Sequence, residues 1–509
     1  MIVDTLSGKL QGLEKRGVHQ FRGIPYARAD RFRPPQPAEP WAGVRDATTF
    51  GPTAPQNASA TESLLGNRQR PSSEDCLFLN VFTSGPGDPE RPVMVWIHGG
   101  GFVAGSGDIV WYDGSTLARA GDVVVVTINY RLGALGFLHL DHLDPALAGS
   151  GTNGTRDQIA ALEWVRDNIA GFGGDAGNVT VFGESAGAMS VGTLLGTPSA
   201  RGLFHRAIAQ SGATAHVHAP STAEPVADAY VAALGASGTG AVEALLAAPV
   251  DDLLQAQAAV EAPLNRDVRG EGGVPVGALT FQPVTGGDLL PRPPLAAVLD
   301  GNAATVPLVA GTTADEWNLF HLQARIAGSL DDEALHRRVA RMVPHDRVAD
   351  VLDAYRHARP DADPDDLLCA AMTDMVFRHP AIQLAEAQLA HTADVGMYRF
   401  DRPSAAMGGV LGACHAIDVP FVFDNLDRGG VDMLLGGLDD DTRRLGSRAA
   451  GAWAAMAHAG APATDELPWP AYDLDRRATC VLDRTPRVDD DPGAELRAMW
   501  AELRPMAPS

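Results

Sequence analysis

The sequence has few lysines, few cysteines and no long apolar run. Lys9 and Lys15 are its only lysines, and 40 basic residues stand against 63 acidic ones, which gives a formal net charge of −23. This excess of negative charge argues against nucleic acid or an anionic membrane surface as a partner. The longest obvious apolar run lies around Val123 to Val126 and is far too short to cross a bilayer, so no membrane-spanning segment is predicted.

The cysteines are widely spaced and fit no CxxC pattern of a metal or redox site: Cys76, Cys369, Cys414 and Cys480. Four cysteines in 509 residues do not make a disulfide scaffold, and their redox state stays open. The first nine residues also lack the charged and then apolar layout of a signal peptide. We therefore expect a cytoplasmic protein that needs no metal and no organic cofactor. Its oligomeric state stays open.

Apolar, β-branched runs predict the strands of a central sheet. Residues 91–97, 122–128 and 178–182 are typical of buried parallel strands, and later strands are expected at 306–310 and 395–400. Between the second and third runs, apolar residues repeat with helical spacing: Ile159, Leu162, Val165 and Ile169. Strand and helix in alternation indicate an α/β fold with a doubly wound, mostly parallel sheet.

Two helical stretches, rich in Ala, Leu, Asp and Arg, interrupt this alternation at residues 223–262 and 329–355. With their flanks they predict helical insertions at about 213–300 and 319–390, within a single domain that spans residues 1–509. We expect the insertions to cap the carboxyl edge of the sheet, where α/β proteins bind ligands. Plain surface helices are the alternative. The glycine-rich connector at 270–277 is interpreted as a loop of the same domain.

A serine lies between two glycines in Gly183-Glu184-Ser185-Ala186-Gly187, after a predicted strand and before a helical stretch. This arrangement is the nucleophile elbow of α/β hydrolases. The sharp turn needs glycine because a Cβ would block the close approach of neighbouring elements. In a chain with 55 glycines the GxSxG pattern alone is only moderately specific, and its position between strand and helix makes it strong.

A second glycine motif, His98-Gly99-Gly100-Gly101-Phe102, follows the predicted strand at 91–97. It matches the oxyanion loop of esterases and lipases. An acyl-transfer serine needs backbone N–H groups that stabilise the developing oxyanion. Gly100, Gly101 and Ala186 are the predicted donors. A glycine turn without chemistry is the alternative.

Further segments carry a family resemblance over nearly the whole chain: residues 21–27 (FRGIPYA), 74–81 (EDCLFLNV), 129–133 (NYRLG), 172–175 (FGGD) and 469–472 (WPAY). Together with the two glycine motifs, these segments resemble the signatures of type-B carboxylesterases, in the same order. That family includes bacterial p-nitrobenzyl-type esterases and the cholinesterases. The resemblance implies the α/β-hydrolase fold, with helical insertions above the active site, and serine carboxylesterase activity.

The resemblance also implies the partners of Ser185. The segment 311–316 (GTTADE) resembles the acid motif of the family and points to Glu316, with Asp315 as the rival carboxylate. The segment 412–418 (GACHAID) resembles the histidine motif and points to His415, which the residues alone do not single out among 15 histidines. Serine, then glutamate, then histidine is the chain order expected for this fold.

Three further residues are expected to support the site without transferring protons. Glu184 and Asp418 match family positions close to the triad, and His98 is expected to brace the glycine loop through hydrogen bonds. The alternative for Glu184 and Asp418 is plain scaffolding. Residues 55–75 contain no cysteine and no aromatic residue, so the cation–π platform of the cholinesterases is missing, which argues against choline esters.

The expected function is hydrolysis of a small-molecule carboxylic ester in two steps, through an acyl-enzyme on Ser185. Activity should fall in acid as His415 is protonated, near the ordinary histidine pKa of about 6.5. A carbamate or amide hydrolase on the same machinery, a lipase for long acyl chains and a non-catalytic binding protein of the same fold are the alternatives. The preferred acyl and alcohol groups stay open.

Overall fold

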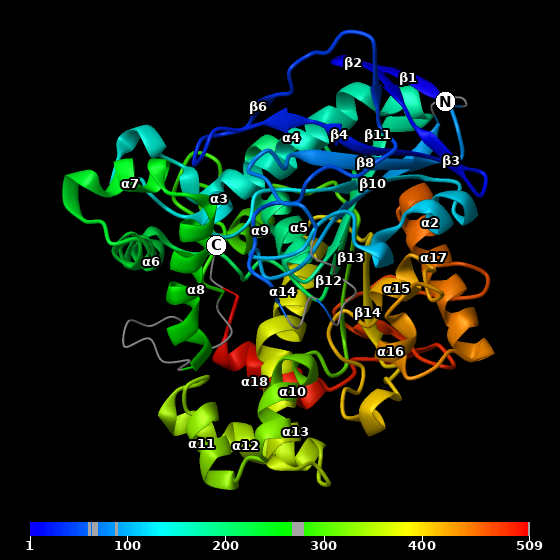
Figure 1. Cartoon of the computed structure of the whole chain (residues 1–509). Coiled ribbons are helices and arrows are strands. Elements are labelled where there is room, and N and C mark those ends of the chain that lie inside the picture. Colours follow the sequence, from blue (N-terminus) through cyan, green and yellow to red (C-terminus); the bar gives the residue numbers. More distant parts are fainter. Residues whose placement is uncertain (60–62, 64–69, 87–89, 267–278, 507–509) are drawn as a thin grey trace.

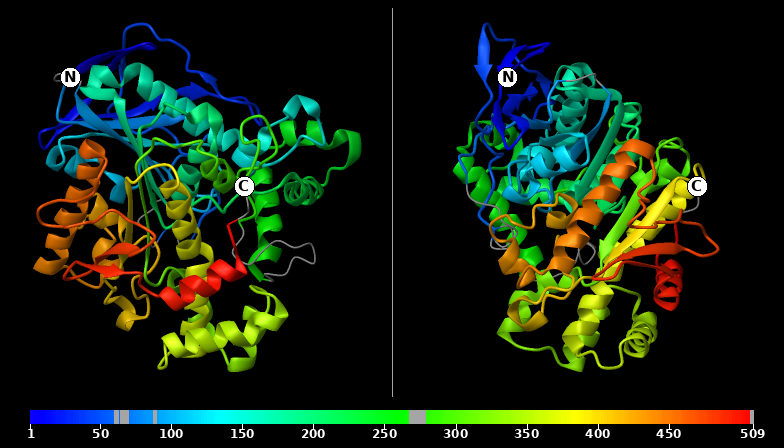
Figure 2. Two further views of the ribbon diagram at one scale, coloured as in Figure 1. Left: turned by 180° about the vertical axis from the view of Figure 1, so that it is seen from behind. Right: turned by 90° about the vertical axis from the view of Figure 1, so that its right-hand side faces the viewer.

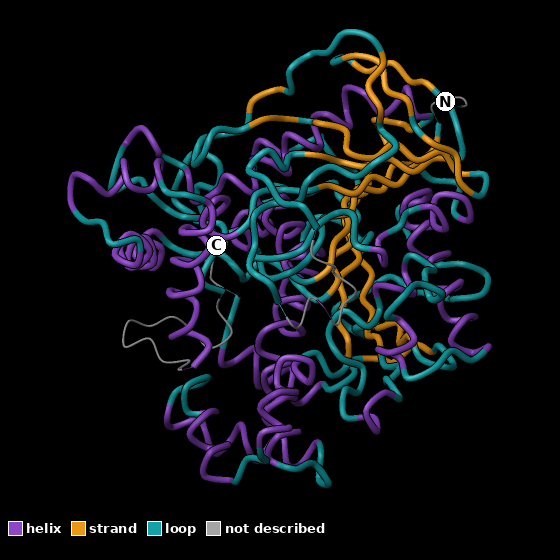
Figure 3. The backbone as a smooth tube through the Cα atoms, in the orientation of Figure 1, coloured by secondary structure: helices purple, strands orange, loops and turns teal. Residues whose placement is uncertain are grey.

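A twisted sheet runs through the middle of the computed structural model, with helices on both of its faces (Figures 1 and 3). The structure describes residues 1–509 except 60–62, 64–69, 87–89, 267–278 and 507–509. Within these residues the sheet has eleven strands, in the spatial order β16 (Arg487–Asp490), β15 (Ala478–Leu482), β14 (Val395–Phe400), β13 (Leu308–Thr313), β12 (Arg206–Gln210), β11 (Gly174–Glu184), β9 (Arg91–Ile97), β10 (Val124–Ile128), β8 (Phe78–Thr83), β4 (Val18–Pro25) and β3 (Leu13–Lys15).

The strands from β10 across to β15 are parallel, and those at the two edges are antiparallel, so the predicted mostly parallel sheet is confirmed. The strands predicted at 91–97 and 395–400 match β9 and β14 residue for residue. β13 begins at Leu308 instead of residue 306 and continues to Thr313. Smaller sheets elsewhere in the described chain contain β1 (Ile2–Thr5), β2 (Gly8–Gln11) and β7 (Val44–Asp46), and β5 (Ala27–Arg28) and β6 (Gln36–Pro37).

Alternate side chains of each central strand enter two different cores, one on each face of the sheet. On β9, Val93 and Val95 pack in one core, whereas Met94 and Trp96 pack in the other. Both faces are therefore covered, which explains why the strands are mostly apolar. The views in Figure 2 show helices on either side of the strands. On one face lie α4 (Asn153–Asn168), α5 (Ala186–Gly196), α9 (Pro294–Leu299) and α14 (His379–Leu389), and on the other α2 (Ser115–Ala120), α15 (Val419–Val422) and α17 (Asp440–Ala459).

Two groups of helices extend away from these layers, one at the left and one at the bottom of Figure 1. They are α6 (Pro220–Ala233), α7 (Ala241–Ala247) and α8 (Val250–Arg266), and α10 (Trp317–Ala327), α11 (Asp332–Val339), α12 (Val348–Ala358) and α13 (Pro364–Thr373). The insertions are shorter than the predicted ranges 213–300 and 319–390, because α9 packs on α5 and α14 packs on β13 as parts of the helical layer. The predicted loop at 270–277 lies outside the described residues, and the single domain stays a prediction.

All four cysteines are free and buried. Burial raises the pKa of Cys369 and Cys480 to about 12 and raises the pKa of Cys76 and Cys414 further. At neutral pH the thiols are therefore protonated and shielded from solvent.

The remaining α-helices of the described chain are α3 (Gly133–Phe137), α16 (Val431–Leu435) and α18 (Ala494–Leu503). Among the helices of the described chain, none combines the length and the apolar character needed to cross a membrane.

Candidate active site

Ser185 occupies the sharp turn between β11 and α5. Its backbone angles, φ 56° and ψ −125°, are strained for a residue other than glycine. A Cβ on Gly187 would lie 1.9 Å from the carbonyl oxygen of Ile97, and a Cβ on Gly183 would lie 2.6 Å from the same atom. Both glycines are therefore required for α5 to approach β9. The N–H of Ser185 donates to the carbonyl oxygen of Gln210 at 2.9 Å, which fastens the turn to β12.

The glycine loop that follows β9 lies against this turn. Gly100 and Gly101 have φ values of 100° and 62°, in the left-handed region that favours glycine. A Cβ built on Gly99 would lie 3.0 Å from the Cβ of Ser185. Among the described residues, no hydrogen bond uses the N–H groups of Gly100 or Gly101. The N–H of Ala186 belongs to the first turn of α5, where helices leave N–H groups unpaired.

His98 is a neutral brace for this loop. Its Nδ1–H donates to the Gly99 carbonyl oxygen at 2.8 Å, and its ring stacks on Tyr130 with centroids 4.5 Å apart. The Tyr130 hydroxyl donates to the His98 carbonyl oxygen at 2.9 Å. Burial lowers the pKa of His98 to about 4, so the ring is uncharged at neutral pH. These contacts are consistent with a bracing role for His98, which stays a prediction.

A buried hydrogen bond joins the predicted base to the predicted acid. His415 Nδ1 lies 2.6 Å from Glu316 Oε2, and both side chains are at most 3% exposed. The other oxygen of Glu316, Oε1, accepts from the N–H of Thr313 at 2.8 Å. The end of β13 therefore fixes the carboxylate, and the carboxylate fixes the imidazole.

Asp315, the rival carboxylate, faces a different partner. Its Oδ2 accepts from the N–H of Ala413 at 3.0 Å, and its Oδ1 lies 3.6 Å from Arg359. The N–H of Asp315 in turn donates to the carbonyl oxygen of Ala413 at 2.9 Å. Asp315 thus ties the end of β13 to the loop that carries His415, and Glu316 is the carboxylate that contacts the imidazole.

The second imidazole nitrogen lies beside the elbow. His415 Nε2 is 3.0 Å from Oε1 of Glu184, the residue directly before Ser185. This contact is an ion pair without the alignment of a hydrogen bond. Among the hydrogen bonds of the described residues, none joins the Ser185 hydroxyl to His415. In ligand-free enzymes such contacts are often long and tighten only when substrate binds.

Residues 1–500 match the family model described as the carboxylesterase family. The chain belongs to the carboxylesterase family. The para-nitrobenzyl esterase of Bacillus subtilis (strain 168) is 39% identical over 97% of each chain. The phenmedipham hydrolase of Pseudarthrobacter oxydans is 36% identical over 97% of this chain and 96% of its own.

Solved structures show the same relationship. The carboxylesterase EST55 of Geobacillus stearothermophilus superposes with a TM-score of 0.86 at 39% identity, and the match covers 98% of this chain and 99% of that one. The α/β-hydrolase fold predicted from the sequence is therefore confirmed, and the members of this family are carboxylic-ester hydrolases.

The charges around His415 alter its acidity in this carboxylesterase. Burial alone would lower its pKa, but the carboxylates of Glu184 and Glu316, together with the more distant Asp418, outweigh burial and raise the pKa to about 9. Proton abstraction needs the neutral imidazole, so a raised pKa moves the acidic limb of the activity profile to higher pH. We therefore expect the acidic limb at higher pH than the ordinary histidine value, because that value takes no account of the carboxylates beside the ring.

Glu184→Gln tests this effect. The amide removes the strongest of the influences that raise the pKa of His415, so the acidic limb of kcat/KM should move down by about one pH unit or more. We would record kcat/KM for p-nitrophenyl acetate from about pH 5 to pH 10. Glu163→Gln makes the same chemical change on the exposed face of α4 and should leave the limb in place. An acidic limb that stays in place in Glu184→Gln would show that the Glu184 carboxylate does not raise the pKa of His415.

Asp418 lies behind the imidazole as an anchor. Its Oδ2 accepts from Gln210 Nε2 at 3.1 Å and from the Tyr398 hydroxyl at 2.8 Å. Burial, with a smaller contribution from the charge of Glu316, raises the pKa of Asp418 to about 6. Trp453 Nε1 donates to the side-chain oxygen of Gln210 at 3.0 Å. Gln210 therefore links the histidine loop, through Asp418, to the backbone of the elbow.

The structure adds three residues that the sequence analysis did not name: Gln210, Phe320 and Phe377. Gln210 ends β12 and pairs in register with Glu184 on β11, and this register is not visible in the sequence. Phe320 lies one helical turn beyond Glu316, which is a usable signal, and its ring contacts His415. Phe377 also contacts His415 and has no signal in the sequence. Within the described chain, no three His, Cys, Asp or Glu side chains are grouped as metal ligands.

Proposed function

We propose that this carboxylesterase acts through a Ser185–His415–Glu316 triad and an acyl-enzyme intermediate. The observation that carries the proposal is the buried 2.6 Å hydrogen bond between His415 and Glu316, which presents Nε2 beside the strained turn of Ser185. A serine hydroxyl is a weak nucleophile until an oriented base removes its proton. These three side chains supply the nucleophile, the base and the group that orients the base.

In the first step, His415 takes the hydroxyl proton as Ser185 Oγ attacks the ester carbonyl carbon. The N–H groups of Gly100, Gly101 and Ala186 hold the oxyanion that develops on the carbonyl oxygen. When the tetrahedral intermediate collapses, the bond to the alcohol oxygen breaks and His415 gives its proton to that oxygen. Glu316 stays ionised and stabilises the imidazolium.

In the second step, water attacks the acyl-enzyme while His415 accepts one of its protons. The acid leaves, and Ser185 regains its proton from His415. Glu316 carries the negative charge beside Nδ1, and Glu184 adds one beside Nε2. Glu184 therefore also favours the imidazolium that forms in each step. Asp418 and His98 hold the histidine loop and the glycine loop in place through the hydrogen bonds described above.

A small-molecule ester is the proposed substrate, and a p-nitrobenzyl ester is the first to test, because one relative is a para-nitrobenzyl esterase. The net charge of −23 supports a protein without nucleic acid or anionic membrane partners. Four unpaired cysteines support a cytoplasmic location, since disulfides persist mainly in oxidising compartments.

Labelling with a fluorophosphonate tests the proposal directly, because the reagent phosphonylates only an activated serine. We expect one adduct by intact mass and, after digestion, its location on the peptide that contains Ser185. Ser185→Ala protein should remain unlabelled under the same conditions. An adduct on another serine, or an unlabelled wild-type protein, would contradict the assigned nucleophile.

A further inference from the structure

The chain between α13 and α14 makes a π-helical turn, Asp374–Arg378. Such turns are rare and are often found at functional sites, because they interrupt the regular helical hydrogen bonds. Two neighbouring residues of this turn lie in different surroundings. Phe377 packs against the imidazole of His415, whereas Arg378 lines a small cavity next to β14.

On the active-site side, two phenyl rings, called the phenyl pair here, contact the imidazole. The centroid of Phe377 lies 4.8 Å from that of His415, and the centroid of Phe320 lies 5.0 Å from it. The phenyl rings are 6.2 Å apart and nearly parallel, with an interplanar angle of 9°. Phe320 is 41% exposed, so filling a core does not explain its place beside a buried histidine.

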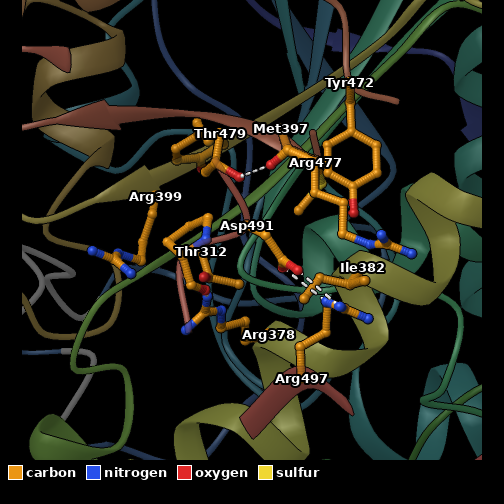
Figure 4. A pocket seen from close by; sticks show the side chains of 12 residues that line it. Thr312, Arg378, Ile382, Met397, Arg399, Tyr472, Arg477, Thr479, Asp491 and Arg497 are labelled. Carbon is orange, nitrogen blue, oxygen red and sulfur yellow. Dashed lines mark hydrogen bonds and ion pairs between the residues drawn. The ribbon is translucent and has the colours of Figure 1, made fainter. Parts of the chain in front are cut away.

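On the opposite side, the turn is fastened to the C-terminal segment. Arg378 donates to the carbonyl oxygen of Pro492 at the wall of the cavity in Figure 4, where Asp491 is also paired with Arg497. The cavity measures about 20 Å³, room for roughly one water molecule. The hydrogen bond from Arg378 to Pro492 is a direct contact between the turn and the C-terminal segment.

A buried chain of hydrogen bonds holds the start of the same turn. Trp500 Nε1 donates to the hydroxyl oxygen of Tyr355 at 2.8 Å, and that hydroxyl donates to Asp374 Oδ2 at 2.6 Å. Trp500 and Tyr355 are each 1% exposed. The two residues belong to α18 and α12, so elements distant in the sequence converge on the turn that carries Phe377.

We propose that Phe377 is a positioning residue for His415, and that the hydrogen-bond chain from Trp500 through Tyr355 to Asp374 holds it against the imidazole. The proposal rests on the proposed function, in which His415 is the base. Glu316 holds the imidazole by a hydrogen bond at Nδ1, whereas Glu184 contacts Nε2 at 3.0 Å without the alignment of a hydrogen bond, so the ring can still rock about the Nδ1 bond. The phenyl pair blocks the rocking of the imidazole on one side and keeps Nε2 beside the elbow.

Phe377→Leu removes one aromatic face and leaves the carboxylates of Glu184, Glu316 and Asp418 in place. We expect kcat for p-nitrophenyl acetate to fall about tenfold while KM changes less than about twofold, because a misplaced base slows chemistry more than binding. An aromatic face also favours a neighbouring cation, so the acidic limb should move down by about 0.5 pH unit. Phe377→Tyr retains the ring and should restore most of kcat.

Three further variants keep the test decisive. Phe320→Leu alters the more exposed ring of the phenyl pair and should lower kcat and the pH of the acidic limb, as Phe377→Leu does. This variant still tests the proposal if Phe377→Leu fails to fold. Trp500→Phe removes the indole N–H together with part of the ring system, so the Tyr355 hydroxyl loses the donor from which it accepts but still donates to Asp374. We expect kcat to fall by about threefold, because the turn is held less firmly. Phe400→Leu, in the core on β14, is the control for lost packing and should lower thermal stability with the acidic limb unchanged.

Unchanged kcat and an unchanged limb in both Phe377→Leu and Phe320→Leu would overturn the inference. If Phe400→Leu changed kcat and the acidic limb as much as Phe377→Leu does, the inference would also be overturned, because any loss of core packing would then produce the effect. Fluorophosphonate labelling separates this failure from failure of the proposed function. If wild-type Ser185 is labelled and Phe377→Leu is labelled at the same rate, only the positioning role is wrong.

Discussion

Ser185→Ala should lower kcat/KM for p-nitrophenyl acetate by about 10⁶-fold, the scale seen when the nucleophile of a serine hydrolase is removed. Alanine has no hydroxyl that can attack the carbonyl carbon, so no acyl-enzyme forms. The oxyanion donors and the binding site stay in place, and they leave a residual acceleration of about 10³–10⁴ over water. The measurement is steady-state hydrolysis with protein purified free of host esterases.

Ser190→Ala is the matched control, one turn further along α5. Ser190 is buried, donates to the Ala186 carbonyl oxygen at 2.8 Å and accepts from Gln158 at 2.9 Å. Within the described residues, neither of these hydrogen bonds involves His415. Its loss should cost stability of about 1 kcal/mol, the usual contribution of one buried hydrogen bond, with little loss of turnover. Full activity in Ser185→Ala would show that the reaction uses another nucleophile.

Glu316→Gln should lower kcat by about 10⁴-fold, as amide replacement of the triad acid does in serine proteases. The amide removes the negative charge that stabilises the imidazolium. Its NH₂ group also donates to Nδ1, so the proton moves to Nε2, the nitrogen that must accept from Ser185. Shape and volume hardly change, and the 2.8 Å hydrogen bond from Thr313 keeps its acceptor oxygen.

Asp315→Asn makes the same chemical change at the adjacent position. It removes the charge opposite Arg359, but that pair is 3.6 Å long and the arginine is 42% exposed, so it contributes little, at most about 1 kcal/mol. The amide oxygen can still accept from Ala413. Asp315→Asn should therefore retain most of kcat. If Asp315→Asn were the damaging variant and Glu316→Gln the mild one, the assignment of the acid would be reversed.

The sequence predicts the central sheet well because its strands are buried on both faces. Strands β9 and β14 are mostly apolar and are followed by a glycine-rich loop and by Asp401, so composition is enough to predict their bounds. The ends of the insertions are less predictable. The sequences of α9 and α14 do not show whether these helices belong to an insertion or to the helical layer, and only their packing on α5 and β13 places them in the layer.

The candidate site likewise contains residues that the local sequence predicts and residues that it does not. Ser185 and Gly100 are visible in the sequence because local backbone geometry restricts which residues can stand there. His415 has no local signature, and the family resemblance alone points to it. The raised pKa of His415 and the contact with Phe377 arise between segments far apart in the chain, so no local pattern contains them.

The four shielded sulfhydryls make this enzyme suitable for conjugation chemistry. Maleimides and iodoacetamides need an accessible thiolate, and the native fold offers neither access nor ionisation at any cysteine. A single cysteine engineered onto the surface would thus take up a dye or a support at one defined point, with no need to delete the natural ones first.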